Sequence, residues 1–292
     1  MVPSNGISLA YETFGDPGAV PILLVMGLGT QMIAWRDGFC ERLAERGHYV
    51  TRFDNRDIGL STHLDDARPG QPVAAFFGRA PAYLIPDMAA DAAGLITELG
   101  VGSAHVVGVS MGGCISQALT LAHPQLVRSL TSISSSTGSR RVGRPRFEVA
   151  ARMLLRRPAA NRDEAIARSV ATWRRIGSPG YPFDLAAVQA LAGEAYDRRY
   201  DPAGGARQFA AILGSPDRTA VLDKVAVRTL VMHGEADPLI GVSGGAATAA
   251  AIPGARLVTF PGMGHDLPEA LWPRFVEEIV ANVAAGEAHR AV

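Results

Sequence analysis

The chain has 292 residues, 48% of them apolar, and its 28 basic and 28 acidic residues give a formal net charge of zero. This length can bury one large core, with or without a subdomain. Zero net charge gives no electrostatic attraction toward nucleic acid, and no segment has the roughly 18 uninterrupted apolar residues of a membrane span. The first residues also lack the basic and apolar regions of a signal peptide. We therefore expect a cytoplasmic protein, a monomer or homodimer, that binds neither nucleic acid nor membrane.

The chain contains two cysteines, Cys40 and Cys114, which are far apart in the sequence. Neither belongs to a Cys-x-x-Cys pair or to a Cys/His pattern with metal-ligand spacing. The sequence therefore predicts neither a disulfide framework nor a metal site, and we expect both thiols to be reduced and packed against helices.

Apolar runs rich in β-branched residues alternate along the chain with longer amphipathic segments. This alternation is typical of βαβ units, in which helices cover both faces of a mostly parallel sheet. The segments with the character of strands are 7–14, 21–26, 50–53, 104–108, 129–134, 227–233 and 256–260. The segments with helical spacing are 39–45, 87–99, 112–122 and 271–284. The sequence therefore predicts an α/β fold.

The alternation stops after residue 134 and resumes only at residue 227. Between them the composition changes to Arg-rich helical stretches interrupted by proline and glycine, with fifteen arginines against eight acidic residues in 139–218. We expect a helical cap of residues 138–222, inserted into a core domain formed by 1–137 and 223–292. Most of its arginines are expected on solvated helix faces, and one or two of them could instead recognise a substrate carboxylate.

The segment 108–113 reads Gly-Val-Ser-Met-Gly-Gly and lies between a predicted strand and a predicted helix. A serine on such a sharp turn exposes its Oγ, and the flanking glycines are needed because a Cβ atom would clash within the turn. The alternative is that the glycines only permit close packing and the serine caps the helix. We interpret Ser110 as a nucleophile.

A serine hydroxyl needs a histidine as general base and an acid that orients the histidine. Asp237 follows a predicted strand and precedes a proline, which favours an extended turn there, and Glu235 in the same loop is the competing acid. His265 follows the last predicted strand on a glycine-framed loop, whereas the other histidines begin or end regular elements or lie in an early loop or the tail. The order Ser110, Asp237, His265 is the order of a known serine hydrolase arrangement.

Acyl transfer also requires backbone amides aimed at the developing oxyanion. The amide of Met111 directly follows the serine. The second donor is expected from the loop after the predicted strand 21–26, in the sequence Met26-Gly27-Leu28-Gly29, where we favour Leu28. An ordinary glycine turn is the alternative interpretation of that loop.

Nearly the whole chain resembles the α/β-hydrolase superfamily, and within it the bacterial carboxylesterases similar to aclacinomycin methylesterase. The stretches that carry the resemblance are 25–29, 53–61, 108–113 and 261–265. It implies an eight-stranded, mostly parallel sheet with a helical cap inserted after strand six. It also implies Ser110, Asp237 and His265 as a catalytic triad, and the amides of Leu28 and Met111 as the oxyanion hole. Many members have a histidine where this chain has Met26, and this departure changes loop support and pocket polarity.

The resulting hypothesis is a serine carboxylic-ester hydrolase that forms an acyl-enzyme on a small to medium apolar or aromatic ester, with no cofactor. The candidates for the substrate pocket share apolar character or nearness to the nucleophile: Gly27, Trp35, Phe76, Phe77, Trp173, Tyr181, Phe183 and Tyr196. Cofactor-free perhydrolase or haloperoxidase activity, and carbon–carbon bond hydrolysis, are alternatives on the same triad, because fold does not decide chemistry. A non-catalytic ligand receptor is a further alternative.

Overall fold

A computed structural model describes residues 1–67, 70–154 and 157–290. Its centre is a seven-stranded sheet with the strand order β3-β5-β4-β6-β7-β8-β9, in which only β3 runs antiparallel to its neighbour. The strands are β3 (Tyr11–Phe14), β4 (Val20–Val25), β5 (His48–Phe53), β6 (Ala104–Val109), β7 (Val127–Ile133), β8 (Arg228–Gly234) and β9 (Arg256–Phe260). A separate hairpin joins β1 (Val2–Ser4) and β2 (Ile7–Leu9).

The expectation of eight strands in one sheet was wrong, because the main sheet has seven. Segment 7–14 does not form one continuous strand, so the hairpin of β1 and β2 is not joined to the main sheet through β3. At the middle of this segment, Ala10 donates its N–H to Ser61 Oγ at 2.9 Å and accepts the N–H of Asp54 at 2.9 Å. The loop after β5 therefore replaces β5 as the hydrogen-bonding partner at this point. Residues before Ala10 join the β1–β2 hairpin, and those after it pair with β5.

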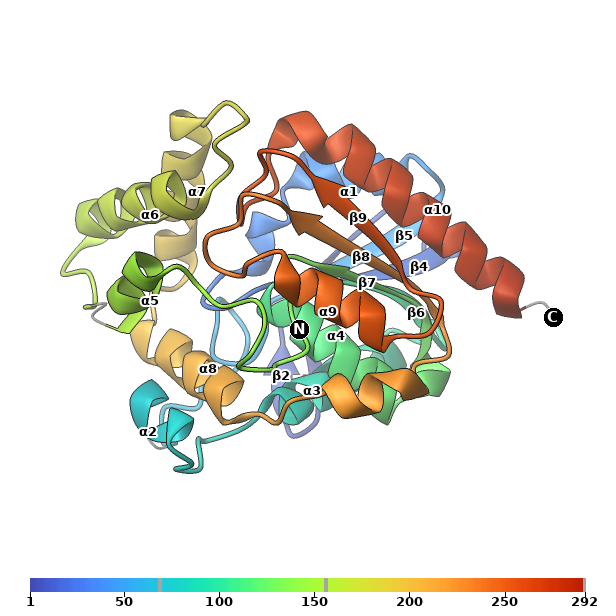
Figure 1. The fold of residues 1–292 in the computed structure, drawn as a ribbon, viewed down its shortest axis with the longest axis horizontal. Coiled ribbons are helices and arrows are strands. Elements are labelled where there is room, and N and C mark those ends of the chain that lie inside the picture. Colours follow the sequence, from blue (N-terminus) through green and yellow to red (C-terminus); the bar gives the residue numbers. More distant parts are fainter. Residues whose placement is uncertain (68–69, 155–156, 291–292) are drawn as a thin grey trace.

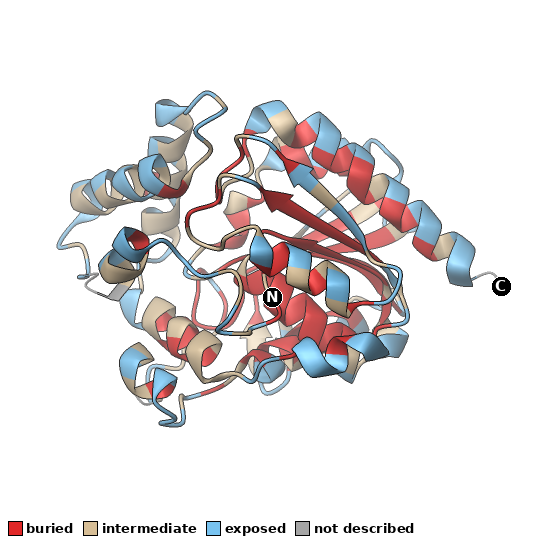
Figure 2. Cartoon of the chain, in the orientation of Figure 1, coloured by how far each residue is buried: buried red, intermediate tan, exposed pale blue. Residues whose placement is uncertain are grey.

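Helices cover both faces of the sheet (Figure 1). On one face, α3 (Ile85–Glu98) and α4 (Met111–Ala122) pack against alternate strand residues such as Leu23 and Val106. On the other, α1 (Asp37–Ala44) and α10 (Trp272–Arg290) pack against the intervening residues, including Leu24 and Val107. The central strands are buried on both sides (Figure 2), which explains their continuous apolar sequence. The smaller α9 (Ser243–Ala251) packs beside β8.

The helices between β7 and β8 lie together at the carboxyl ends of the parallel strands (Figure 1). They are α5 (Phe147–Leu154), α6 (Arg162–Ile176), α7 (Leu185–Arg198) and α8 (Pro202–Gly214), and the short α2 (Pro72–Phe76) packs on α8. Asn161, Asp184 and Asp201 cap the amino termini of α6, α7 and α8 by accepting backbone N–H groups. Within the described residues, no helix combines the length and the apolar composition needed to cross a bilayer.

Candidate active site

Ser110 occupies the turn between β6 and α4 with φ of 57° and ψ of −120°. This left-handed backbone is strained for a residue with a side chain, and the surrounding packing maintains it. A Cβ atom at Gly108 would lie 2.2 Å from the carbonyl oxygen of Gly112, and one at Gly112 would lie 2.0 Å from that of Val25. The two glycines therefore let the turn close tightly under the serine, as its sequence predicts.

Ser110, His265 and Asp237 form one hydrogen-bonded chain, although they come from three separate loops. His265 Nε2 lies 3.0 Å from Ser110 Oγ, and His265 Nδ1 lies 2.7 Å from Asp237 Oδ2. Asp237 follows β8, and His265 follows β9, so the adjacent carboxyl ends of parallel strands bring them together. Both residues are buried, at 6% and 7% exposure. Asp237 Oδ1 also accepts the N–H groups of Leu239 and Ile240, each at 2.9 Å, which orients the carboxylate.

The competing acid, Glu235, points elsewhere. Its Oε1 accepts the hydroxyl of Thr259 at 2.8 Å, and the residue is exposed. The structure thus brings only Asp237 to the imidazole of His265.

A second histidine, His233, lies close to Asp237 but has a different role. Its Nε2 is 2.8 Å from the carbonyl oxygen of Ile240, which can only accept, so Nε2 carries the proton. Burial lowers the pKa of His233, which keeps the ring neutral. His233 therefore lines the acid's loop without carrying a charge into it.

Of the two amides predicted as oxyanion donors, that of Met111 directly follows Ser110, and that of Leu28 directly follows Gly27. Gly27 is next to the serine, because a Cβ atom there would be 3.2 Å from Ser110 Cβ and 3.7 Å from its Oγ. Among the described residues, neither the Leu28 N–H nor the Met111 N–H has an acceptor. Within the described part of the chain, both amides therefore remain available to donate to a ligand.

Residues 54–61, which belong to one of the stretches that carry the family resemblance, connect several segments around the site. Asp54 Oδ1 accepts the N–H of Met32 at 2.7 Å, and Oδ2 accepts the N–H of Leu60 at 3.0 Å. The side-chain amide of Asn55 donates to the carbonyl oxygen of Met26 at 3.0 Å. These contacts tie the end of β5 to the loop that carries Leu28.

Two arginines of the inserted helices form ion pairs with this same segment, Arg207 in a buried position and Arg198 in a partly buried one. Arg198 Nη2 lies 2.7 Å from Asp54 Oδ2, and Arg207 binds both carboxylate oxygens of Asp57, at 2.9 and 2.7 Å. The expectation that most arginines of the insert are solvated gave no reason to single out these two. Nothing in the sequence around Arg198 and Arg207 sets them apart from the other arginines of the insert. Only their partners in the folded chain, Asp54 and Asp57, distinguish them.

The insert also binds the loop that carries His265. The backbone N–H of His265 donates to the carbonyl oxygen of Ile176 at 2.7 Å, and Ser178 Oγ accepts the N–H of Gly264 at 2.9 Å. Ser178 in turn donates to Asp266, whose pKa is raised by burial. A Cβ atom at Gly264 would lie 2.2 Å from the carbonyl oxygen of Gly177, so the glycine permits this close approach.

The predicted pocket aromatics occupy different environments. Trp35 is only 1% exposed and stacks on Phe39 inside the core, with ring centroids 5.5 Å apart, so it does not belong to an open pocket. Phe77, at 81% exposed, lies on the surface beside the half-exposed Phe76. The remaining candidates come from the insert: Trp173, Tyr181 and Tyr196 are half-buried, and Phe183 is exposed. Tyr181 donates to the carbonyl oxygen of Pro261, just before the His265 loop.

One group of side chains in the described part of the chain could in principle hold a metal ion, namely Asp57, His63 and Asp201, whose ligand atoms lie within 4.8 Å of one another. Arg207 Nη2 already lies 2.7 Å from Asp57 and 3.6 Å from Asp201. His63 contacts Asp201 through one ring nitrogen and the carbonyl oxygen of Gly59 through the other. The guanidinium thus supplies the positive charge that these carboxylates need.

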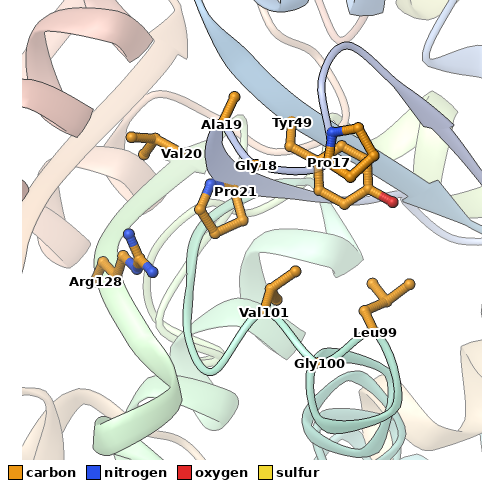
Figure 3. A pocket seen from close by; sticks show the side chains of 10 residues that line it. All are labelled: Pro17, Gly18, Ala19, Val20, Pro21, Tyr49, Leu99, Gly100, Val101 and Arg128. Carbon is orange, nitrogen blue, oxygen red and sulfur yellow. The ribbon is translucent and has the colours of Figure 1, made fainter.

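A surface hollow of about 320 Å³ lies at the amino ends of the parallel strands, opposite the end that carries Ser110 (Figure 3). Its lining includes Val20 and Pro21 at the start of β4, Tyr49 near the start of β5 and Arg128 near the start of β7. Ser110, Asp237 and His265 follow the carboxyl ends of strands, so the hollow is separate from them.

Comparisons with known proteins agree with this geometry. A family model described as the α/β hydrolase fold matches residues 20–269. The rhodomycin D methylesterase of Streptomyces sp. (strain C5) is 31% identical, over 98% of this chain and 98% of its own. The rhodomycin D methylesterase of Streptomyces peucetius is 30% identical over the same shares. An enol-lactonase structure from Burkholderia xenovorans LB400 has a TM-score of 0.72 at 24% identity, covering 96% of this chain and 98% of its own, which bears on the fold alone.

The family match covers most of the chain, and the two methylesterases align with nearly all of it. Together with the mostly parallel sheet, they confirm the predicted fold class apart from the strand number. The chain therefore belongs to the α/β-hydrolase fold family and is a hydrolase of the carboxylesterase type.

Proposed function

We propose that Ser110 is the nucleophile of a serine esterase, with His265 as general base and Asp237 as the acid that orients it. The observation that carries the proposal is the hydrogen-bonded chain from Asp237 through His265 to Ser110. Asp237 accepts a hydrogen bond from His265 Nδ1, so the proton of the neutral ring lies on Nδ1. His265 Nε2 is then free to accept a hydrogen bond from the serine hydroxyl. His265 can then remove the proton of Ser110 as its Oγ attacks an ester carbonyl.

The attack forms a tetrahedral intermediate, and its negatively charged oxygen accepts hydrogen bonds from the backbone amides of Met111 and Leu28. As the intermediate collapses, His265 returns the proton to the leaving alcohol and an acyl-enzyme remains on Ser110. Water, activated by His265, then attacks the acyl carbonyl, and the proton passes back to Ser110 Oγ as the acid is released. The same side chains thus act in both the acylation and the deacylation step.

The proposed substrate is a methyl ester of a small to medium apolar or aromatic acid. The full-length similarity to two rhodomycin D methylesterases supports the ester class. The half-buried aromatic residues Trp173, Tyr181 and Tyr196 on the insert support an apolar or aromatic acyl part. We propose residues 138–222 as the cap that selects this substrate and the remainder as the domain that carries the chemistry.

The test is a panel of methyl and p-nitrophenyl esters of increasing acyl size, run with the wild-type enzyme and Ser110→Ala. We expect Ser110→Ala to lose about 10⁴-fold or more in kcat/KM, because no other group can form the acyl-enzyme. Ser103→Ala, just before the first residue of β6, is the matched control and should keep full activity. Wild-type-like turnover by Ser110→Ala would refute the assignment.

The rival chemistries are outcomes of the same set of assays. Peroxide-dependent halogenation without ester turnover would indicate a perhydrolase or haloperoxidase, and cleavage of a coloured dienoate would indicate a carbon–carbon hydrolase. Ligand binding that leaves every ester intact would indicate a receptor.

A further inference from the structure

The short segment 26–29, which carries the proposed Leu28 donor, is held at both ends by side-chain amides. At one end Asn55 Nδ2 donates to the carbonyl oxygen of Met26 at 3.0 Å. At the other end Gln208 Oε1 accepts the N–H of Gly29 at 2.8 Å. The peptide group between Gly27 and Leu28, which would provide the oxyanion donor, lies between these two clamped peptide groups. Asn55 belongs to the core, whereas Gln208 belongs to α8 of the insert.

The Gln208 side chain is fully buried, at 0% exposure, and both of its polar atoms form hydrogen bonds. Besides accepting from Gly29, it donates from Nε2 to the carbonyl oxygen of Arg56 at 2.8 Å. A backbone N–H can only donate and a carbonyl can only accept, so one orientation of the amide satisfies both partners. Leaving either partner unpaired in this buried position would be unfavourable. The two hydrogen bonds therefore fix Gln208 and, through it, the Leu28–Gly29 peptide.

Among the described residues the Leu28 N–H has no acceptor of its own. The Thr30 hydroxyl also donates to the carbonyl oxygen of Leu28 at 3.1 Å, but Thr30 belongs to the same stretch of backbone. Gly29 has φ of 63° and no side chain, so this part of the backbone is intrinsically free to rotate. Met26, which precedes Gly27, has a thioether that offers only a weak acceptor to the loop. Hydrogen bonds to this backbone from side chains of other segments come from Asn55 and Gln208.

We propose that Gln208 is a positioning residue that holds the oxyanion hole in its active geometry. The inference rests on the proposed function, since it requires the Leu28 amide to act as an oxyanion donor. Such donors are effective because they are aligned before the reaction begins. The preceding residue, Arg207, anchors α8 to the core through its ion pair with Asp57. The insert thus contributes to the chemistry itself, in addition to covering the substrate.

The test uses Gln208→Met, which keeps the length of the side chain and removes both hydrogen bonds. The primary readout is the rate at which a fluorophosphonate labels Ser110, because this reaction passes through a similar oxyanion and needs no knowledge of the natural substrate. We expect the labelling rate and the kcat for a p-nitrophenyl ester to fall about 10- to 100-fold, with KM changed about three-fold or less. The shape of the pH profile should not change, because neither His265 nor Asp237 contacts Gln208.

Gln208→Glu serves as a second variant in case Gln208→Met does not fold. It keeps an acceptor for Gly29 and loses the donor to Arg56, so we expect a labelling rate between those of the wild type and Gln208→Met. Gln189→Met, on the exposed face of α7, is the matched control and should label at the wild-type rate.

Folded Gln208→Met and Gln208→Glu proteins that are labelled at the wild-type rate would overturn the inference while leaving the proposed function intact. A rate loss that merely follows the unfolded fraction, measured by circular dichroism, would also overturn it. A folded wild-type protein that is not labelled at Ser110 and hydrolyses no ester would instead overturn both proposals.

Discussion

Asp237 and Glu235 are two residues apart in the loop after β8, yet they have different surroundings. Asp237 is buried and accepts two backbone N–H groups through one oxygen, while the other oxygen faces His265. Glu235 is exposed and bonded to Thr259. Backbone N–H groups hold a carboxylate in one position and stabilise its charge, which suits an acid that must keep an imidazole oriented.

Asp237→Asn tests this assignment. The amide can present a donor to His265 Nδ1 and so favour the wrong ring tautomer, which leaves Nε2 protonated and unable to accept from Ser110. We expect kcat for a p-nitrophenyl ester to fall about 10⁴-fold, by analogy with the corresponding change in a serine protease triad. Glu235→Gln is the matched control. If Glu235→Gln were the more damaging substitution, the two acids would have to exchange roles.

At the scale of elements, the insert is joined to the core by buried polar contacts as well as by apolar packing. Arg198 and Arg207, on α7 and α8, pair with the acids of the loop after β5. The segment after α6 pairs with the loop of His265. Thus α7 and α8 contact the loop after β5, and the end of α6 with the residues after it contacts the loop of His265. A change in the docking of these helices would therefore move the loops that carry or support the site residues.

Arg207→Met tests how strongly α8 is anchored. The substitution leaves the carboxylate of Asp57 buried without its cation, and we expect the free energy of unfolding to fall by about 3–5 kcal/mol. Arg162→Met is a matched control within the insert, because Arg162 forms a similar two-pronged pair with Asp197 on the exposed surface. That pair is screened by water and should leave the urea unfolding midpoint unchanged. Equal midpoints for the two variants would contradict the anchoring role of Arg207.

At the scale of the whole molecule, buried histidines make stability depend on pH. His105 lies under α10, where Nδ1 is 2.8 Å from Ser129 Oγ and Nε2 is 3.1 Å from Glu287 Oε1. Burial lowers the pKa of His105 from its ordinary value of 6.5 to about 4, although the charge of Glu287 acts in the opposite direction. Burial also lowers the pKa values of His48 and His233. The folded chain therefore keeps these rings neutral where the unfolded chain binds protons.

The free energy of unfolding should consequently fall as the pH falls from 7 to 5. Above the ordinary pKa both states are neutral and His105 contributes no slope; below it only the unfolded state takes up the proton, until the folded pKa is reached. We expect His105 to account for about 2 kcal/mol of the loss between pH 7 and pH 5. His105→Gln should remove that part of the slope in urea unfolding curves, whatever its effect at pH 7. His289→Gln, on an exposed ring, should leave the slope unchanged, and a His105→Gln slope equal to that of the wild type would contradict the prediction.

Local patterns in the sequence were sufficient for the fold class. The strand and helix periods follow from which faces are buried, so β4, β6, β7, β8, α3, α4 and α10 all lie where the sequence predicts them, within a few residues. Segment 7–14 differs because its partner changes at Ala10, and a strand's partner is not a local property. α9 gave no amphipathic signal because its sequence consists of small residues, Ser-Gly-Gly-Ala-Ala-Thr-Ala-Ala-Ala. The turn glycines around Ser110 were visible because backbone geometry constrains residue type locally.

By itself, the sequence determined the α/β class, the serine turn and the order of Ser110, Asp237 and His265, because each depends on neighbours along the chain. Tertiary structure placed Asp237, and not Glu235, beside His265, and it placed Trp35 inside the core. It also gave Arg198, Arg207 and Gln208 their partners in the core. The physical reason is that a hydrogen bond or ion pair depends on distance in space. Gly29 and Gln208 are 179 positions apart in the chain and 2.8 Å apart in the fold, and no local pattern encodes such a contact.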